Sequence, residues 1–180
     1  MAILRQRAIL IGGFAAIIVI AGMAGFFILS SRRAAPPTEA ELKIAPQFSL
    51  KNYDGAEIKS SDFSGKSAVI ISWASWCARL CRGELEELAT LKKEFGDHIA
   101  VVAINRAEAL EIARAYSDAL GINNSVIFLS DPDDSFYKSI GGFSMPEAIF
   151  IDAAGKLKHH ARWPMQEEEF RRRMEDLIRK

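Results

Sequence analysis

Three short apolar runs that alternate with amphipathic helical patterns constrain the fold of this chain more than any other feature. The runs occupy residues 68–71, 99–104 and 125–129, and each has the length of a buried strand. Apolar residues recur at helical spacing over 81–95, after the first run, and over 112–120, after the second. Strands that alternate with helices, followed by a hairpin and a last helix, predict an α/β protein built on a mixed sheet.

Two hairpins and a last helix complete the predicted fold. A turn sequence at 52–55 lies between short apolar segments near the start of the domain, and a second turn at 153–155 joins the runs 148–152 and 156–160. Apolar residues within 170–178 fall on one helical face. We therefore predict a three-layer α/β/α sandwich with an N-terminal β-hairpin, in which helices cover both faces of a mixed sheet.

The first 31 residues differ in character from the rest. Residues 8–29 contain no charge and are numerous enough to cross a bilayer. The run ends in Ser-Ser-Arg-Arg and not in a small-residue cleavage site, which favours an uncleaved transmembrane helix over a signal peptide. Basic residues flank it on both sides, so charge leaves its orientation open. We predict a membrane anchor at 1–31, a proline-containing linker at 32–44 and a folded domain at 45–180.

The two cysteines of the chain, Cys77 and Cys81, follow the first apolar run at the point where a helical pattern begins. Two cysteines are too few for a disulfide-stapled scaffold, so a close pair indicates redox or metal chemistry. A helix N-terminus stabilises a thiolate, which favours Cys77 as a nucleophile. The chain has 23 basic and 23 acidic residues, and this neutral balance argues against a nucleic-acid binder.

The spacing of the pair is CxxxC. In an ideal helix, Cα atoms four residues apart are separated by about 6.2 Å, which is near the upper limit of the disulfide range. A Cys77–Cys81 bridge therefore needs Cys77 to lie off the helix axis, or the helix to carry a local irregularity. We expect such a bridge to be strained and for that reason easier to reduce.

Residues 73–77, 81–85 and 142–152 resemble motifs of the membrane-anchored thioredoxin-fold proteins of the TlpA/ResA type. The resemblance extends over 45–180 and implies a thioredoxin-like fold. Members of that family use a redox-active disulfide, without another cofactor, to exchange disulfides with substrate proteins. The family has two residues between its cysteines, so the third intervening residue is a departure from its pattern.

The resemblance also implies a role for individual residues. Cys77 would be the attacking thiolate and Cys81 the resolving thiol. Pro146 would follow a cis peptide bond opposite them, although a trans proline at a strand edge is an alternative interpretation. Met145 would present backbone groups that hold the substrate strand. Ile71 stands where thioredoxins proper carry a buried acid, which removes one proton acceptor.

Three other residues near the motif, Trp73, Trp76 and Glu108, are candidate site residues. Trp73 is either a core residue or a substrate contact, whereas we expect Trp76 to shield the sulfurs. Glu108 matches an acidic position near the active site in some relatives, where it would assist proton transfer. A glutamate in the first turn of a helix is the simpler interpretation of Glu108, since such a residue needs no catalytic role.

The cysteine spacing also resembles that of Sco-type copper chaperones. Two thiolates suit Cu(I), and a histidine would complete the site. That histidine would be expected near Ser144 and Met145, where the chain has none. We expect His98, His159 and His160 to be solvent-exposed strand residues. Delivery of copper is therefore the alternative function, and under the main interpretation there is no metal.

We predict a membrane-tethered thiol-disulfide oxidoreductase that reduces protein disulfides outside the cytoplasm, for example in cytochrome c maturation. Its partners would be a protein disulfide or dithiol substrate and a membrane-embedded electron donor. The resemblance implies a single-pass protein of the bacterial inner membrane, with its C-terminal domain on the periplasmic or outer face. A peroxidase is disfavoured because Ala74 replaces the hydroxyl residue it would need, and a redox-inactive interaction module is a further alternative.

Overall fold

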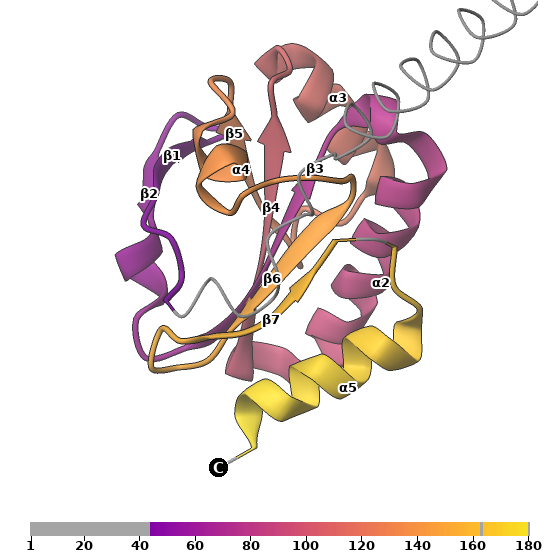
Figure 1. Cartoon of the computed structure of the whole chain (residues 1–180). Coiled ribbons are helices and arrows are strands. Elements are labelled where there is room, and N and C mark those ends of the chain that lie inside the picture. The colour runs from indigo at the N-terminus through magenta and orange to yellow at the C-terminus, as the bar shows by residue number, and fades with distance from the viewer. Residues whose placement is uncertain (1–43, 163, 180) are drawn as a thin grey trace, which may run out of the picture. The chain divides into compact units, whose positions relative to one another are not determined.

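The computed structural model describes residues 44–162 and 164–179, which form one mixed sheet with helices packed on it (Figure 1). The predicted transmembrane segment at 8–29 and almost all of the linker lie outside the described residues. In the part of the chain that is described, no helix is both long and apolar enough to span a bilayer. The division into anchor, linker and domain therefore stays a prediction.

The sheet has seven strands within the described residues. They are β1 (Ser49–Asn52), β2 (Glu57–Lys59), β3 (Ser67–Trp73), β4 (Ile99–Arg106), β5 (Ile127–Asp131), β6 (Glu147–Ile151) and β7 (Leu157–Ala161). Their order across the sheet is β2-β1-β5-β4-β3-β6-β7. The three central strands β3, β4 and β5 are parallel, and every other pairing is antiparallel. Both predicted hairpins are confirmed as β1–β2 and β6–β7.

The central strand β3 shows why the sheet is covered on both faces. All seven of its residues are buried, as expected for a strand with neighbours on both edges and layers on both faces. Its side chains alternate between two apolar clusters, with Val69 and Ile71 in one and Ala68 and Ile70 in the other. The continuous apolar run in the sequence therefore encodes a strand that is buried on both faces.

The helices divide unequally between these two clusters. They are α2 (Ala78–Phe95), α3 (Leu110–Leu120), α4 (Ser135–Ser139) and α5 (Glu167–Ile178), with short 3-10 turns η1 (Ser60–Phe63), η2 (Ser75–Cys77) and η3 (Gly96–His98). Side chains of α2, α3 and α5 enter the first cluster, whereas α4 enters the second together with Phe48. The helix α4 was not predicted from the sequence, because its five residues are too few to show a helical period.

The parallel strands end together at one edge of the sheet. Trp73 at the end of β3 pairs with Asn105, and Arg106 at the end of β4 pairs with Asp131 at the end of β5. Because β6 runs antiparallel to β3, its first residue, Glu147, lies at this same edge. The segments that follow β3, β4 and β5 and the loop that precedes β6 therefore meet there, where α/β proteins place their chemistry.

Candidate active site

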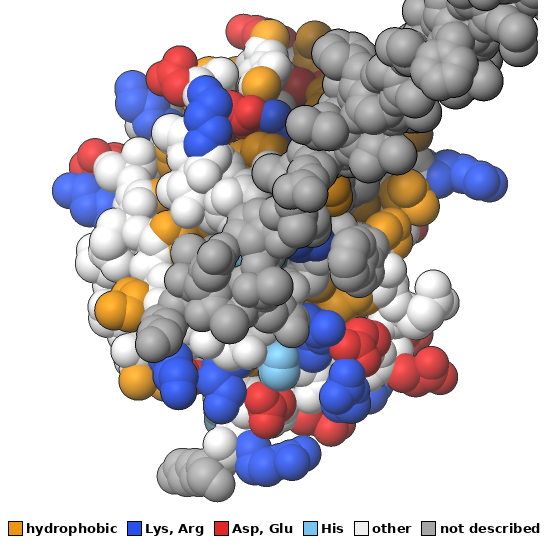
Figure 2. Space-filling model, in the orientation of Figure 1, with side chains coloured by type: hydrophobic (Ala, Val, Ile, Leu, Met, Phe, Trp, Pro, Cys, Tyr) orange, Lys and Arg blue, Asp and Glu red, His pale blue; other side chains and the backbone are white. Residues whose placement is uncertain are grey.

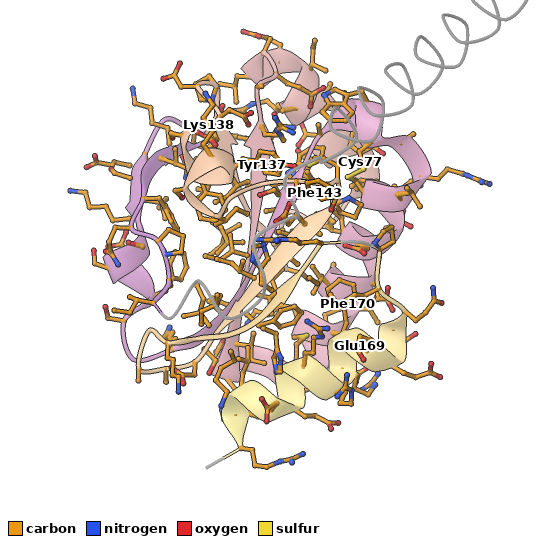
Figure 3. The ribbon with its side chains drawn as sticks, in the orientation of Figure 1. Cys77, Tyr137, Lys138, Phe143, Glu169 and Phe170 are labelled. Carbon is orange, nitrogen blue, oxygen red and sulfur yellow. A yellow bond between two sulfur atoms is a disulfide. The ribbon has the colours of Figure 1, made fainter. Side chains whose placement is uncertain are left out.

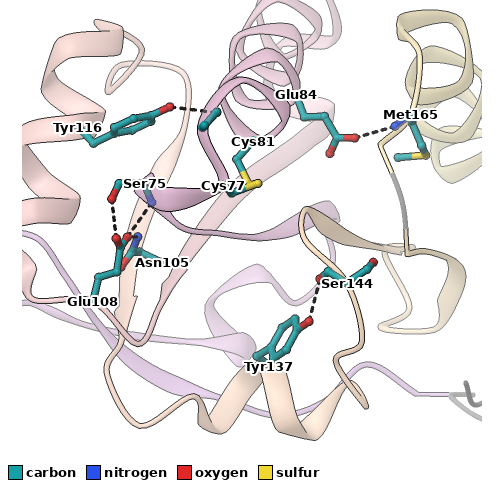
Figure 4. The surroundings of a disulfide bond; sticks show 11 residues. Ser75, Cys77, Cys81, Glu84, Asn105, Glu108, Tyr116, Tyr137, Ser144 and Met165 are labelled. Carbon is teal, nitrogen blue, oxygen red and sulfur yellow. Dashed lines mark hydrogen bonds between the residues drawn. A yellow bond between two sulfur atoms is a disulfide. The ribbon is translucent and has the colours of Figure 1, made fainter. Parts of the chain in front are cut away.

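The two cysteines lie in and directly after the turn that joins β3 to α2. Cys77 ends η2 and Cys81 lies in the first turn of α2. Their sulfurs form a disulfide with an S–S distance of 2.07 Å, and their Cα atoms are 5.5 Å apart (Figures 3 and 4). Cys81 is fully buried whereas Cys77 is half-buried, so Cys77 is the more accessible sulfur.

The backbone accommodates the extra residue of the CxxxC motif at Ala78. This residue has φ of 52° and ψ of −129°, a conformation that residues with a Cβ rarely adopt. The irregularity brings the cysteine Cα atoms closer than the roughly 6.2 Å of an ideal helix. The prediction that the start of the helix must be irregular is therefore confirmed. The hydroxyl of Tyr116 on α3 donates a hydrogen bond to the Ala78 carbonyl at 3.2 Å (Figure 4).

Glu108 connects the loop after β4 to the cysteine turn. Its Oε2 accepts hydrogen bonds from the Ser75 backbone N–H at 2.8 Å and from Asn105 Nδ2 at 2.7 Å, and its Oε1 accepts one from the Ser75 hydroxyl at 2.5 Å (Figure 4). Glu108 precedes Ala109, the N-cap of α3, so its interpretation as a first-turn helix residue is wrong. The structure instead makes it a residue that positions the turn leading to Cys77.

The loop before β6 faces the cysteine turn, and the Met145–Pro146 peptide bond in it is cis, as the resemblance predicted. The hydroxyl of Tyr137 on α4 donates to the Ser144 carbonyl at 2.8 Å (Figure 4). A Cβ added at Gly142 would lie 2.4 Å from Cε1 of Tyr137, so only glycine fits beside that ring. Asp131 in turn accepts hydrogen bonds from the first backbone N–H groups of α4, which fixes the helix that carries Tyr137.

Glu147, the first residue of β6, holds the same loop through hydrogen bonds to its backbone. Its Oε2 accepts the backbone N–H groups of Phe143 at 2.8 Å and Ser144 at 3.1 Å. Its Oε1 lies 2.6 Å from Nε2 of His160 and 3.3 Å from Nε of Arg162, and the side chains of all three residues are nearly inaccessible. Burial acts to raise the pKa of Glu147, but these hydrogen bonds and the charge of His160 outweigh it and hold the pKa below its usual range.

A second buried glutamate, Glu84, lies on α2 three residues after Cys81 and on the same helix face. It is 4% exposed and accepts one hydrogen bond, from the backbone N–H of Met165 at 2.6 Å (Figure 4). Burial raises the pKa of Glu84 to about 8, although the bond from Met165 opposes the rise. Sequence reasoning missed this acid as a site residue. The sequence feature that could have revealed Glu84 is its position on the helix face of Cys81, Leu85 and Leu88, where only apolar contacts were predicted.

The two tryptophans near the motif have opposite environments. Trp73 has no exposed surface and packs against the rings of Tyr116 and Phe128, with centroids 5.5 and 5.7 Å away. This burial favours the core role of Trp73 and gives no surface for a substrate contact. Trp76 is 60% exposed next to Cys77, and the guanidinium of Arg106 lies 6.0 Å from the centroid of its ring.

Large apolar side chains are exposed around the disulfide. Besides Trp76, they are Leu80 in the first turn of α2 and Phe143 in the loop before Pro146, both more than half exposed. Figure 2 shows hydrophobic side chains near the start of α2, whereas charged side chains of both signs gather over α5. Met145 is half-buried beside them. Exposed apolar side chains therefore lie near the disulfide, whereas the far end of this face is charged.

The histidines bear on the copper alternative. His160 is buried against Glu147 and does not lie on a solvent-exposed strand face, so that expectation is wrong for it. His160 pairs with Ile149 of β6 in the sheet, and its ring lies 2.6 Å from the inaccessible carboxylate of Glu147. Among residues 44–162 and 164–179, no group of three or more His, Cys, Asp or Glu side chains is arranged to hold a metal ion. The copper alternative thus gains no support from the described residues.

Comparison with known proteins gives the family. The model of the Redoxin family matches residues 40–178. The chain belongs to the Redoxin family. Relatives of this Redoxin chain include the thioredoxin-like protein YneN of Bacillus subtilis, 30% identical over 117 residues, a match that covers 63% of this chain and 66% of that protein. The thiol-disulfide oxidoreductase ResA of Bacillus subtilis is 26% identical, over 74% of this chain and 73% of ResA.

Two further similarities cover nearly the whole of the other protein. The thiol:disulfide interchange protein HelX of Rhodobacter capsulatus is 28% identical over 92% of this chain and 94% of HelX. The solved structure of MTB DsbF in mixed oxidised and reduced forms is 25% identical, with a TM-score of 0.67 over 73% of this chain and 95% of DsbF. These findings confirm the TlpA/ResA resemblance, the thioredoxin-like fold and the predicted enzyme class, a thiol-disulfide oxidoreductase.

Proposed function

We propose that this Redoxin protein is a membrane-tethered reductase of protein disulfides that acts outside the cytoplasm through Cys77 and Cys81. The observation that carries the proposal is the asymmetry of the disulfide, in which Cys77 is half-buried and Cys81 has no exposed surface. An exchange enzyme needs one accessible sulfur to meet the substrate and one protected sulfur to resolve the intermediate. The disulfide itself is the redox group, and the proposal requires no further cofactor.

The reaction follows from that asymmetry. In the reduced protein, the Cys77 thiolate attacks one sulfur of a substrate disulfide, which forms a mixed disulfide and releases the first substrate thiolate. The Cys81 thiolate then attacks the Cys77 sulfur, which closes the Cys77–Cys81 bond and releases the second substrate thiolate. Two electrons have then passed to the substrate. A membrane-embedded dithiol donor must return them by the same exchange in reverse.

The apolar rim supports the choice of a protein as substrate. Trp76 and Leu80, which are neighbours of the two cysteines in the sequence, and Phe143 in the loop before Pro146 expose apolar surface, which is typical of a site that receives another protein chain. Met145 precedes the cis peptide bond, which supports a role for its backbone groups in pairing with an extended substrate segment. We assign Met145 and Pro146 to substrate positioning, and Trp76 to shielding of the sulfurs.

A pair of cysteine variants tests the exchange mechanism in the full chain. Cys81→Ser leaves Cys77 able to attack but removes the resolving thiol, so we expect it to accumulate a mixed disulfide with a disulfide-containing test protein. Cys77→Ser should form none. Intact mass after alkylation of free thiols counts the products. Equal trapping by both variants, or by neither, would contradict the proposed roles.

The direction of electron flow is tested by redox titrations of the full chain in dithiothreitol buffers and in glutathione buffers. A reductase is expected to have a midpoint potential near that of thioredoxin, about −270 mV, whereas a strong oxidant lies near about −120 mV. A clean two-thiol transition at the negative end supports reduction of substrates, for example of the cysteine pair of an apocytochrome c. A midpoint at the oxidising end would reverse the proposed direction.

The proposed location is the bacterial inner membrane, with a single span at 8–29 and the catalytic domain facing the periplasm. The uncharged length of 8–29 supports the span. We expect the full chain to remain with membranes through a high-salt wash and to leave them only in detergent. In intact spheroplasts, a membrane-impermeant thiol reagent should label Cys77 after mild reduction. Release of the protein by salt, or labelling only after lysis, would contradict this location.

A further inference from the structure

The conformation of Ala78 is the feature of the active site that the exchange mechanism leaves unexplained. It is the residue directly after Cys77, inside the ring that the disulfide closes, and its φ of 52° with ψ of −129° is a combination that disfavours any side chain with a Cβ. A regular start of α2 would give this residue a negative φ. Something in the oxidised protein must therefore hold Ala78 in place.

Two contacts of the oxidised protein hold it. The first is the covalent ring itself, which fixes the Cα atoms of Cys77 and Cys81 at 5.5 Å. The second is the hydroxyl of Tyr116, which donates a hydrogen bond to the Ala78 carbonyl at 3.2 Å (Figure 4). Because ψ of Ala78 sets the direction of that carbonyl, the Tyr116 bond is specific to the unusual conformation.

We propose that Ala78 is a redox-linked hinge, which is held at positive φ while the disulfide is closed and relaxes to a regular helical conformation when it is reduced. Ala78 and Tyr116 are then positioning residues that set the reduction potential in opposite senses. The strain at Ala78 favours the reduced form, and the Tyr116 hydrogen bond favours the oxidised form. This inference rests on the proposed function because it concerns the same disulfide.

The hinge is tested by the midpoint potentials of variants in full-chain titrations with dithiothreitol. In each titration the dithiol is oxidised to its cyclic disulfide, and two electrons and two protons pass to the sulfurs of Cys77 and Cys81. Ala78→Gly removes the conflict with a Cβ, so we expect about a tenfold shift toward the disulfide, or about 30 mV more negative. Tyr116→Phe should shift the equilibrium about threefold the other way.

Two glycine variants serve as matched controls. Ala107→Gly relieves an alanine with the same φ of 52° that lies outside the disulfide ring, so it should leave the midpoint unchanged. Leu80→Gly adds flexibility inside the ring at a position without a positive φ, so it should not make the midpoint more negative. A negative shift from either control equal to that of Ala78→Gly would overturn the hinge.

A direct structural readout completes the test. A positive φ gives a strong intraresidue cross-peak between the amide proton and Hα, and we expect this cross-peak for Ala78 in the oxidised wild-type protein and its loss on reduction. Persistence of the cross-peak after reduction, or an unchanged midpoint in Ala78→Gly, would overturn the hinge while the exchange function stands. Absence of any two-thiol transition in the wild-type protein would overturn both.

Discussion

Two buried glutamates flank the disulfide, and their ionisation behaviour is opposite. Glu84 lies on the α2 side, where burial raises its pKa to about 8. Glu147 lies under the loop of Pro146, where the pKa is held below its usual range. Burial acts to raise the pKa in both cases, so burial alone does not decide the outcome.

The difference lies in the partners of each carboxylate. Glu84 has one hydrogen bond from a backbone N–H, and its neighbour Glu87 is a like charge that raises its pKa further. Glu147 has two backbone N–H donors and contacts His160 and Arg162. The comparison teaches that one side of the site is built to keep a proton at neutral pH and the other is built to keep a charge.

Removal of the charged member should have the largest effect. Glu147→Ala removes the carboxylate that contacts both Arg162 and His160 and also removes the acceptor of two backbone N–H groups of the loop, so we expect a loss of about 3–5 kcal/mol in the free energy of unfolding. Urea denaturation measures it, with the exposed Glu168→Ala as control, expected to change by less than about 0.5 kcal/mol. Similar losses in the two variants would mean that Glu147 is not a buried anchor.

His160→Gln should make Glu147 behave more like Glu84. A lowered folded-state pKa contributes stability above the unfolded-state pKa, and this stability is lost as pH falls through the folded-state value. Without His160, that contribution shrinks, so we expect a loss of about 1–3 kcal/mol at pH 7 and a smaller loss at pH 3. Unfolding free energies at both pH values measure it.

The adjacent histidine offers a matched control for that experiment. His159 contacts Asp176 at 3.0 Å, and both side chains are partly exposed. His159→Gln should therefore cost less than about 1 kcal/mol. If His159→Gln and His160→Gln shift the pH profile alike, the assignment of the Glu147 pKa to its buried histidine is wrong.

Glu84→Gln should stabilise the protein at alkaline pH. Because the folded-state pKa of Glu84 is raised to about 8, stability is full below the unfolded-state value and is lost as pH rises toward 8. A neutral glutamine removes that loss, and we expect a gain of about 1–3 kcal/mol at pH 9 and almost none at pH 4. Thermal unfolding at the two pH values measures the gain. An equal effect at both would show that Glu84 does not titrate in this range.

The central fold could be predicted because its strands, helices and hairpins each show a local sequence pattern. The buried run of β3, the helical spacing of α2 and α3, and both hairpins follow from local pattern. The helix α4 could not be predicted in this way, since its five residues are fixed from outside by Asp131, which accepts the first N–H groups of the helix. Short elements of this kind depend on a partner that a periodicity does not contain.

The site divides in the same way. The cysteine pair and Pro146 stand in motifs that the sequence displays, whereas the contacts of Glu147 with His160 and of Glu108 with Ser75 join residues 13 and 33 positions apart. These contacts form only when β7 pairs with β6 in the sheet, and when the loop after β4 lies against the turn that leads to Cys77. The CxxxC spacing predicted a backbone irregularity at the start of the helix, but it did not predict that Ala78 would adopt it.

Glu108 is a third glutamate of the site and is less buried than Glu84 and Glu147. Its hydrogen-bond partners, Ser75 and Asn105, are neutral. Glu108→Ala removes three hydrogen bonds that hold Ser75 and Asn105, and we expect a loss of about 1–2 kcal/mol, below that of Glu147→Ala because no buried cation is left behind. Glu108→Gln keeps acceptor capacity at one oxygen and should recover part of the loss. Exchange rates with a test disulfide should follow the same order if Glu108 acts by positioning the turn. A Glu108→Gln protein that is stable but as slow as Glu108→Ala would instead assign the carboxylate a direct part in proton transfer.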